Sequence, residues 1–342
     1  MGDSPSFRWL RPPGDPPPGG SGGHTLAGME QVSLGPLRVS RVGLGCNNFG
    51  GRLDFDRTRS VVDAALAAGI TFFDTADIYG GRGGSERMLG ELLRGRRDEV
   101  VLATKFGGDM GDDVAARGEP GYVRRALDRS LERLQTDRVD LLYYHWPDEV
   151  TPIAETVAAM AELVDAGKVR AIGVSNLTVE QLEEAAGAAP IAALQNEYSL
   201  LERSPERDLL PRCVELGIGF VPYYPLAAGL LTGKYKHGGL PPQGTRWAGE
   251  EAMSEGTWVS PSVEASATTF ALVDRLAGYA RSHGHDLLQL AIAGLASRPG
   301  VASVIAGATS PAQIAANAAA AEWHLSAAEL EEIPERCAPK GV

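Results

Sequence analysis

The chain contains little cysteine, few aromatic residues and no long hydrophobic run. Its three cysteines, Cys46, Cys213 and Cys337, lie far apart and show no C-x-x-C spacing. This argues against a disulfide framework and favours reduced thiols in a cytoplasmic protein. No apolar run reaches the ~18 residues that a membrane-spanning helix needs, so we expect no membrane partner.

Positive charge is also scarce. Lysine and arginine number 32 against 44 aspartate and glutamate, which gives a formal net charge of −12. Because such a chain repels polyanions, we expect no nucleic-acid partner. His283 and His285 flank Gly284 without cysteine or acidic partners at ligand spacing, so we predict no metal site.

Composition divides the chain into two parts. Residues 11–23 are almost entirely proline and glycine, and such a segment cannot bury enough apolar surface to offset the entropy of ordering. We therefore predict a disordered tail over residues 1–28 and a single domain over residues 29–342.

That domain opens with a predicted β-hairpin over residues 30–40, turning at Gly35-Pro36. Apolar runs then alternate with helical patterns. The predicted strands are 42–46, 71–74, 100–105, 141–145, 169–174, 192–196, 219–223 and 301–305. The predicted helices are 57–68, 85–93, 121–134, 153–166, 179–186, 205–216, 265–283 and 287–297.

Eight strands separated by helices predict an α/β fold with a parallel sheet, and eight is the number that closes a (β/α)8 TIM barrel. A doubly wound open sheet is the alternative, but residues 43–50 do not fit its G-x-G-x-x-G turn. Ser326 and Glu329 have capping-box spacing and predict an extra C-terminal helix against the barrel. The long segment from Lys234 to Ser262 interrupts the repeat and is expected to be functional.

Polar residues end most of the predicted strands, where barrel enzymes place their active sites. A lysine ammonium beside a phenol favours the phenolate, and a carboxylate beside the lysine holds it charged. An imidazole nearby can orient a carbonyl oxygen. These groups form the acid half of a carbonyl reduction, whose hydride must come from a cofactor. The strand-end residues are Asp74, Tyr79, Lys105, His145, Ser175, Asn176, Gln195 and Tyr223.

Several of these motifs, in this order, resemble the aldo-keto reductase superfamily. They include Asp74-Thr-Ala-Asp-Ile-Tyr79, the run from Gly167 to Asn176, and Tyr223-Tyr-Pro-Leu-Ala-Ala-Gly-Leu-Leu-Thr-Gly-Lys234. The resemblance covers roughly residues 32–317. It implies a (β/α)8 barrel that binds a nicotinamide cofactor in extended form, without a Rossmann domain. Together with the hairpin and the capping box, this predicts a (β/α)8 TIM barrel with an N-terminal β-hairpin and extra C-terminal helices. The resemblance also implies a catalytic tetrad of Asp74, Tyr79, Lys105 and His145, in which Tyr79 is the general acid/base.

The same resemblance implies a set of cofactor contacts. Ser175, Asn176 and Gln195 match positions that bind the carboxamide, and Tyr223 matches the aromatic residue that stacks on the nicotinamide ring. The remaining contacts are with the pyrophosphate, at Leu226, Gly229 and Lys234, and with the adenosine, at Gly307, Thr309, Gln313 and Asn317.

The adenosine segment departs from the family pattern. Residues 307–317 contain no lysine or arginine, although the family often pairs the 2′-phosphate with one, and a dianionic phosphate loses its strongest contacts without a cation. The expected cofactor is therefore NADP(H) or NAD(H), with the choice left open.

We expect the substrate to be a carbonyl or alcohol compound such as an aldehyde, a ketone, a sugar or a natural-product carbonyl. The predicted substrate residues are Asn47, Asn48, Phe49 and Trp146, which line the pocket together with Tyr79 and parts of the loop that holds Trp247 and Trp258. Loop residues of this kind do not select among substrates. A homo-oligomer is also open, since members of this family occur as monomers and as assemblies.

Two other functions compete with the oxidoreductase. One is a cofactor-binding regulatory protein, like the channel-associated members that keep this barrel. The other is a barrel isomerase or aldolase with Lys105 as a Schiff base, which leaves the Ser-Asn, Gln and Tyr-Tyr-Pro-Leu positions unexplained.

Overall fold

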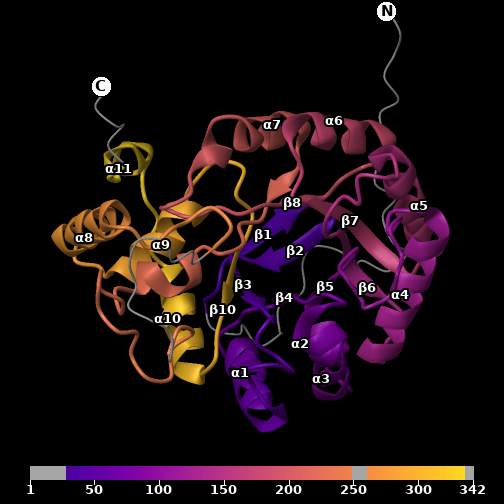
Figure 1. The fold of residues 1–342 in the computed structure, drawn as a ribbon, viewed down its shortest axis with the longest axis horizontal. Helices are drawn as coiled ribbons and strands as arrows, with labels where there is room; N and C mark the ends of the chain where they lie inside the picture. Colours follow the sequence, from indigo (N-terminus) through magenta and orange to yellow (C-terminus); the bar gives the residue numbers. More distant parts are fainter. Residues whose placement is uncertain (1–27, 249–259, 336–342) are drawn as a thin grey trace, which may run out of the picture.

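The computed structural model describes residues 28–248 and 260–335. Eight parallel strands lie in the order β10-β3-β4-β5-β6-β7-β8-β9, and a separate two-stranded antiparallel hairpin, β1–β2, precedes them. Figure 1 looks along the barrel, with the helices arranged around the strands. This confirms the predicted α/β barrel with its N-terminal hairpin.

The strands are β1 (Gln31–Leu34), β2 (Leu37–Ser40), β3 (Val42–Gly45), β4 (Phe72–Asp74), β5 (Val101–Phe106), β6 (Val139–Tyr144), β7 (Val169–Ser175), β8 (Ala193–Gln195), β9 (Gly219–Phe220) and β10 (Val304–Gly307). The α-helices are α1 (Phe55–Ala67), α2 (Tyr79–Arg82), α3 (Gly84–Leu92), α4 (Pro120–Leu134), α5 (Ile153–Asp165), α6 (Val179–Ala188), α7 (Leu209–Leu216), α8 (Ala267–Ser282), α9 (Leu287–Ala296), α10 (Pro311–Ala320) and α11 (Ala327–Glu332). Three 3-10 helices are η1 (Arg97–Glu99), η2 (Ser204–Glu206) and η3 (Ala227–Thr232).

The sheet closes on both sides of β10. This strand pairs with β3 in parallel, with Gly307 opposite Gly45. On its other side, Ala302 N donates to Phe220 O at 2.9 Å and Ile305 N donates to Pro222 O at 3.3 Å. The first and last strands of the barrel are therefore neighbours, although more than 250 residues separate them.

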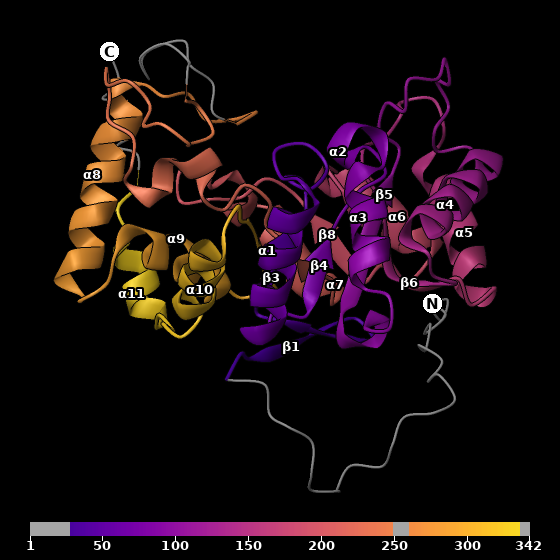
Figure 2. The same cartoon turned by 90° about the horizontal axis from the view of Figure 1, so that it is seen from below.

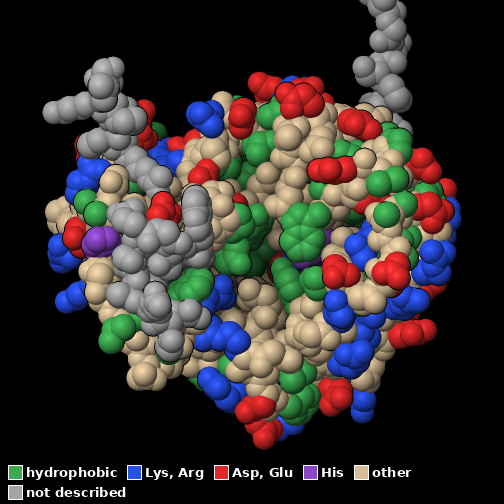
Figure 3. Space-filling view, in the orientation of Figure 1, with side chains coloured by type: hydrophobic (Ala, Val, Ile, Leu, Met, Phe, Trp, Pro, Cys, Tyr) green, Lys and Arg blue, Asp and Glu red, His purple; other side chains and the backbone are tan. Residues whose placement is uncertain are grey.

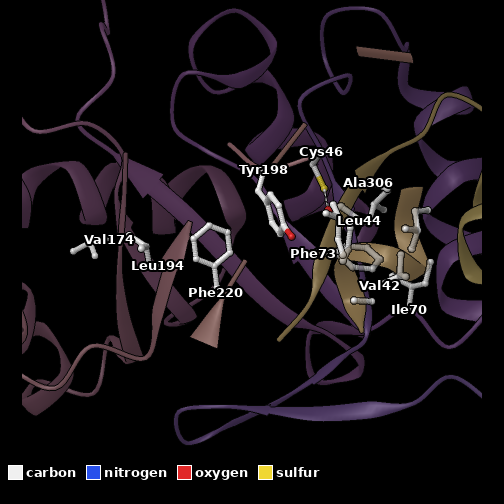
Figure 4. Packing of buried hydrophobic residues seen from close by; sticks show 14 of the residues in the cluster. Val42, Leu44, Cys46, Ile70, Phe73, Val174, Leu194, Tyr198, Phe220 and Ala306 are labelled. Atoms are coloured by element: carbon white, nitrogen blue, oxygen red, sulfur yellow. Dashed lines mark hydrogen bonds between the residues drawn. The ribbon is translucent and has the colours of Figure 1, made fainter. Parts of the chain in front are cut away.

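Strand alternation divides the apolar residues between two clusters. Leu142 and Tyr144 of β6 face outward and pack under the helices, whereas Leu141 and Tyr143 of the same strand face the barrel interior. Figure 4 shows members of the outer cluster on β3, β4, β7, β8 and β9. The strands are buried on both faces, which explains their continuous apolar runs.

The hairpin closes one end of the barrel. Its residues Leu34, Leu37 and Val39 are buried with the interior cluster. Figure 2 shows the hairpin at the end of the barrel opposite α2. Only the end that carries α2 is left open to hold a site.

Local sequence signals set most helix starts. The side chains of Asp54 and Ser266 cap α1 and α8, and full capping boxes begin α6 at Thr178, α9 at Asp286 and α11 at Ser326. These side chains satisfy backbone N–H groups that have no partner within the helix. The predicted box of Ser326 and Glu329 is confirmed.

Other expectations differ from the structure. The last strand begins at Val304 rather than residue 301, with only an isolated bridge at Val301. Helix α10, capped by Ser310, follows it, in a segment for which only adenosine contacts are expected from the sequence. The turn at Gly35-Pro36 is confirmed. Nearly all of the predicted tail, residues 1–27, lies outside the described residues.

Within the described part of the chain, no helix is both long enough and apolar enough to cross a membrane.

The turn at Gly80 and Gly81 offers a matched test of backbone constraint beside Tyr79. Both glycines have positive φ, at 68° and 71°. A Cβ at Gly80 would collide with Phe49 O, whereas a Cβ at Gly81 would meet nothing within 4 Å. We expect Gly81→Ala to cost roughly 1–2 kcal/mol of stability from the left-handed conformation alone. Gly80→Ala should cost clearly more, because it adds the collision.

Urea unfolding of both variants measures this difference. Equal losses of stability would show that the turn moves freely away from Phe49, contrary to this account.

Candidate active site

The open end of the barrel carries a ring of polar side chains. Because alternate residues of a strand share a face, Asp74 follows the interior residue Phe72 on β4, and Lys105 follows the interior residue Ala103 on β5. The other members of this ring are His145 just after β6, Ser175 at the end of β7 and Gln195 at the end of β8. The ring therefore results from strand register.

A buried ammonium is at the centre of the ring. Lys105 is 0% exposed; its Nζ donates to Asp74 Oδ1, to Thr75 O at 2.9 Å and to Tyr79 Oη at 3.4 Å. Burial alone would lower the pKa of Lys105, but the charge of Asp74 and the contact with Tyr79 hold it above its usual value. The lysine is thus a cation at neutral pH.

The phenol of Tyr79 differs from the expectation in one respect. Burial raises its pKa, and the Lys105 ammonium lowers it by a smaller amount, so the pKa stands above the usual value. The lysine acts in the predicted direction, but desolvation outweighs it. Tyr79 is consequently protonated at neutral pH, which is the state that a proton donor requires.

His145 is held neutral beside the phenol. Burial, and then the Lys105 charge, keep its pKa well below the usual value. Its ring meets Tyr79 edge-on at a centroid distance of 5.9 Å and stacks on Trp146 at 3.5 Å. Its Nδ1 atom is buried without a hydrogen-bond partner among the described residues. A neutral imidazole can donate one N–H to a carbonyl oxygen.

The amide residues form a second layer of bonds around the tetrad. Gln195 Nε2 donates to Asp74 Oδ2 at 3.0 Å, and Ser175 Oγ donates to Gln195 O at 2.6 Å. Asn176 Nδ2 donates to His145 O at 2.9 Å, and Asn176 Oδ1 accepts from Tyr223 Oη at 2.8 Å. These bonds fix the side chains on the strands that follow the tetrad.

A cavity of about 630 Å³ opens over this ring. Asp74, Tyr79 and His145 line it, with Lys105 directly behind Asp74 and Tyr79. Asn47, Asn48 and Trp146 line it as well. The predicted cofactor residues all line this one cavity: Ser175, Asn176, Gln195, Tyr223, Leu226, Gly229, Lys234, Gly307, Thr309, Gln313 and Asn317.

One of the aromatic residues expected at the substrate lies elsewhere. Phe49 is 0% exposed and belongs to the core under the helices, because it is held by a turn in which Leu53 N donates to Asn48 O. Trp247 packs against the same core. Trp258 lies outside the described residues. The expectation that Phe49 lines the pocket is therefore wrong. Parts of the loop that holds Trp247 do line it, at Gly244, Thr245, Arg246 and Pro261.

Two arginines that we had not considered line the cavity, Arg52 in the loop after β3 and Arg246 in the segment after η3. The guanidinium of Arg246 lies 6.0 Å from the centroid of the Tyr224 ring. Both arginines lie in loops outside residues 307–317, the segment in which the absence of lysine and arginine was noted.

Among the described residues, no group of three or more histidine, cysteine, aspartate and glutamate side chains could hold a metal ion.

Comparison with known proteins identifies relatives of this chain. A family model described as "Aldo/keto reductase family" matches residues 41–336. Aldo-keto reductase YhdN of Bacillus subtilis is 34% identical over 315 residues, covering 89% of this chain and 92% of the relative. Probable aldo-keto reductase 1 of Glycine max is 34% identical over 320 residues, covering 91% and 90%. The holo form of aldo-keto reductase AKR11C1 from Bacillus halodurans superposes with a TM-score of 0.74 at 29% identity, covering 92% of this chain and 99% of that one.

Asp77 is a buried acid in the segment between Asp74 and Tyr79, and one of its carboxylate oxygens lacks a partner among the described residues. Asp77 is 2% exposed, and its Oδ1 has no hydrogen-bond partner among the described residues. Arg133 is engaged by Glu86 at 2.5 Å, and Glu86 also accepts from Thr104 at 2.6 Å. Burial and then the charge of Glu86 raise the pKa of Asp77 from 3.8 to about 7, against the weaker opposing effect of Arg133.

This raised pKa determines how the stability of the fold changes with pH. Between the unfolded pKa of 3.8 and the folded pKa of about 7, the folded protein holds more protons, so stability falls as pH rises. Asp77→Asn removes this penalty. We expect the variant to gain on the order of 1–4 kcal/mol over the wild type at about pH 8, and progressively less towards about pH 5. Urea unfolding across this range measures the gain.

Asp113→Asn is the control, because it makes the same chemical change at an exposed aspartate. An Asp77→Asn effect that is independent of pH would rule out titration of Asp77 as its cause.

Proposed function

Because the chain belongs to the aldo/keto reductase family of nicotinamide-dependent oxidoreductases, we propose that it transfers hydride between NAD(H) or NADP(H) and a carbonyl or alcohol substrate. In this proposal Asp74, Tyr79, Lys105 and His145 are the catalytic residues, and Tyr79 is the general acid/base. The observation that carries it is the fully buried Lys105 ammonium, which contacts both Asp74 and Tyr79 at the base of the cavity.

The side chains divide the proton chemistry among them. In the reducing direction, Tyr79 gives its phenolic proton to the carbonyl oxygen as that oxygen gains negative charge. Lys105 stabilises the phenolate that remains, and Asp74 keeps Lys105 charged and in place. The neutral imidazole of His145 directs the carbonyl oxygen towards Tyr79. When bound, a nicotinamide dinucleotide supplies or accepts the hydride, which no side chain can do.

The cavity residues fit such a dinucleotide. Ser175, Asn176 and Gln195 offer hydroxyl and amide groups beside the tetrad, suited to a carboxamide, and the ring of Tyr223 is available for stacking. For the diphosphate, the cations Lys234 and Arg246 line the cavity. Gly307, Thr309, Gln313 and Asn317 follow on the α10 side, where adenosine contacts are proposed.

The substrate end is partly polar. Asn47 and Asn48 supply amides, and Trp146, which is 42% exposed, supplies an aromatic face at the mouth. These groups suit an aldehyde, ketone or sugar that has both hydrogen-bonding and apolar surfaces. They support a carbonyl substrate of moderate polarity rather than a long aliphatic one.

The Schiff-base alternative is disfavoured by the state of Lys105. A Schiff base requires a neutral amine with a lowered pKa, but the pKa of Lys105 is raised and its ammonium is paired with Asp74. A cofactor-binding regulatory protein remains as the second function, and turnover separates it from an enzyme.

Nucleotide binding is the first test. NADPH and NADH are titrated separately and followed by tryptophan fluorescence, which reports on the cavity because Trp146 lines it. We expect at least one of the two nucleotides to bind. A panel of aldehydes, ketones and sugars is then assayed with the nucleotide that binds. Binding without turnover would favour the regulatory protein, and no binding of either nucleotide would remove the oxidoreductase proposal.

The role of Tyr79 can be separated from folding and binding. Tyr79→Phe keeps the ring but removes the proton, so we expect turnover to fall by at least about 100-fold. The Kd for the nucleotide should stay nearly unchanged, because the phenol acts on the carbonyl oxygen. Fluorescence titration and steady-state kinetics of the same preparation measure both quantities. Loss of nucleotide binding in this variant would contradict the assigned role.

A further inference from the structure

We infer that Arg52 binds a phosphate group of the dinucleotide and supplies the cation that residues 307–317 lack. This inference rests on the proposed function, since it concerns the same cavity. It assigns a nucleotide contact to the loop between β3 and α1, where no phosphate contact is expected from the sequence.

Barrel closure brings the two segments together. Since β3 and β10 are paired with Gly45 opposite Gly307, the loops that leave these strands start side by side. Asn48 Nδ2 donates to Ala308 O at 3.5 Å, so the loops are also in contact. Arg52 and Thr309 then line the same cavity.

Hydrogen bonds fix the backbone around Arg52, whereas its guanidinium has no hydrogen-bond or ion-pair partner among the described residues. Gly50 N donates to Leu53 O at 3.2 Å and Leu53 N donates to Asn48 O at 2.9 Å, and the next residue, Asp54, caps α1. No hydrogen bond or ion pair joins the Arg52 guanidinium to another part of the described chain. By contrast, Arg97 and Arg133 each contact a buried carboxylate, Asp140 or Glu86.

The side chains that line the cavity carry an excess of positive charge. Arg52, Lys234 and Arg246 line it, and Asp74, its lining carboxylate, is paired with Lys105. Figure 3 shows basic side chains beside the hollow on this face of the molecule. The chain as a whole has a net charge of −12. An excess of cations in one cavity of an acidic protein indicates an anionic occupant.

The distribution of these cations favours a third phosphate. Lys234 and Arg246 both belong to the segment after η3 and suffice for the two charges of a diphosphate. Arg52 instead lies in the loop after β3, the strand that pairs with β10 and so adjoins the adenosine segment. Its planar guanidinium can form two parallel hydrogen bonds with a phosphate, which matches the 2′-phosphate of NADP(H).

The test compares Arg52→Gln with Arg57→Gln. Arg57 is also exposed and lies in the first turn of α1, but it does not line the cavity, so both variants lose one positive charge in the same region. The Kd of each variant for NADPH and for NADH is measured by fluorescence titration at low salt. We expect Arg52→Gln to weaken NADPH binding about tenfold, which corresponds to about 1.4 kcal/mol, and Arg57→Gln to leave it unchanged.

The pattern across nucleotides identifies the phosphate. Weaker NADPH binding with unchanged NADH binding assigns Arg52 to the 2′-phosphate, and equal weakening of both assigns it to the diphosphate. Arg52→Lys should restore part of the affinity, because it restores the charge without the planar fork. The effect should shrink as salt is added.

Two outcomes overturn the inference. One is unchanged affinity of Arg52→Gln for both nucleotides. The other is that only the KM of an acidic aldehyde changes, while the KM of its neutral analogue and the affinities for both nucleotides stay at wild-type values. That result would assign Arg52 to a substrate oxyanion. Failure of the wild type to bind either nucleotide is a separate result, since it contradicts the proposed function itself.

Discussion

The site depends on placing one ammonium group inside the barrel. Moving a lysine from water into a protein interior costs several kcal/mol unless oxygen atoms surround it. Here those atoms are the Asp74 carboxylate, the Thr75 carbonyl and the Tyr79 phenol, all from β4 and the turn that follows. The pairing of β4 with β5, which sets Asp74 opposite Ala103, is therefore a chemical requirement as well as a structural one. A shift of one residue would turn Lys105 towards the helices and leave the carboxylate alone.

The same desolvation sets the protonation states on which the proposed chemistry depends. Burial raises the pKa of Tyr79 and lowers that of His145, so both groups are neutral while Lys105 is charged. A protonated phenol and a neutral imidazole can each offer a hydrogen to one carbonyl oxygen. The nearby cation then lowers the energy of the phenolate at the moment when the proton leaves. Trp146 covers one face of His145 and so contributes to keeping water away from this imidazole.

The sequence was most informative where a side chain lies on a strand. Asp74, Lys105, Ser175 and Gln195 each end an apolar run, and strand alternation directs them into the barrel, so their position could be predicted from the pattern. Phe49 lies in a turn, where no periodicity shows which way a side chain points, and its burial could not be predicted. Helix α10 was missed because its alanine-rich sequence follows a strand closely and has little amphipathic pattern of its own. Arg52 lies in the same loop as Phe49, so the direction of its side chain into the cavity could not be predicted either, although closure of β10 onto β3 was expected.

Closure of the barrel also reconciles an acidic chain with the proposed binding of an acidic nucleotide. Among the described residues, most acidic side chains are exposed or partly exposed on the outer surface, and many are paired with arginines there. The cavity instead brings together Arg52, Lys234 and Arg246 from loops that are far apart in the sequence. Low-dielectric walls concentrate the field of such cations, so a few charges inside a cavity outweigh a larger opposite charge spread over a hydrated surface. Net charge accordingly argues against binding of an extended polyanion but is compatible with a small anion that enters the barrel.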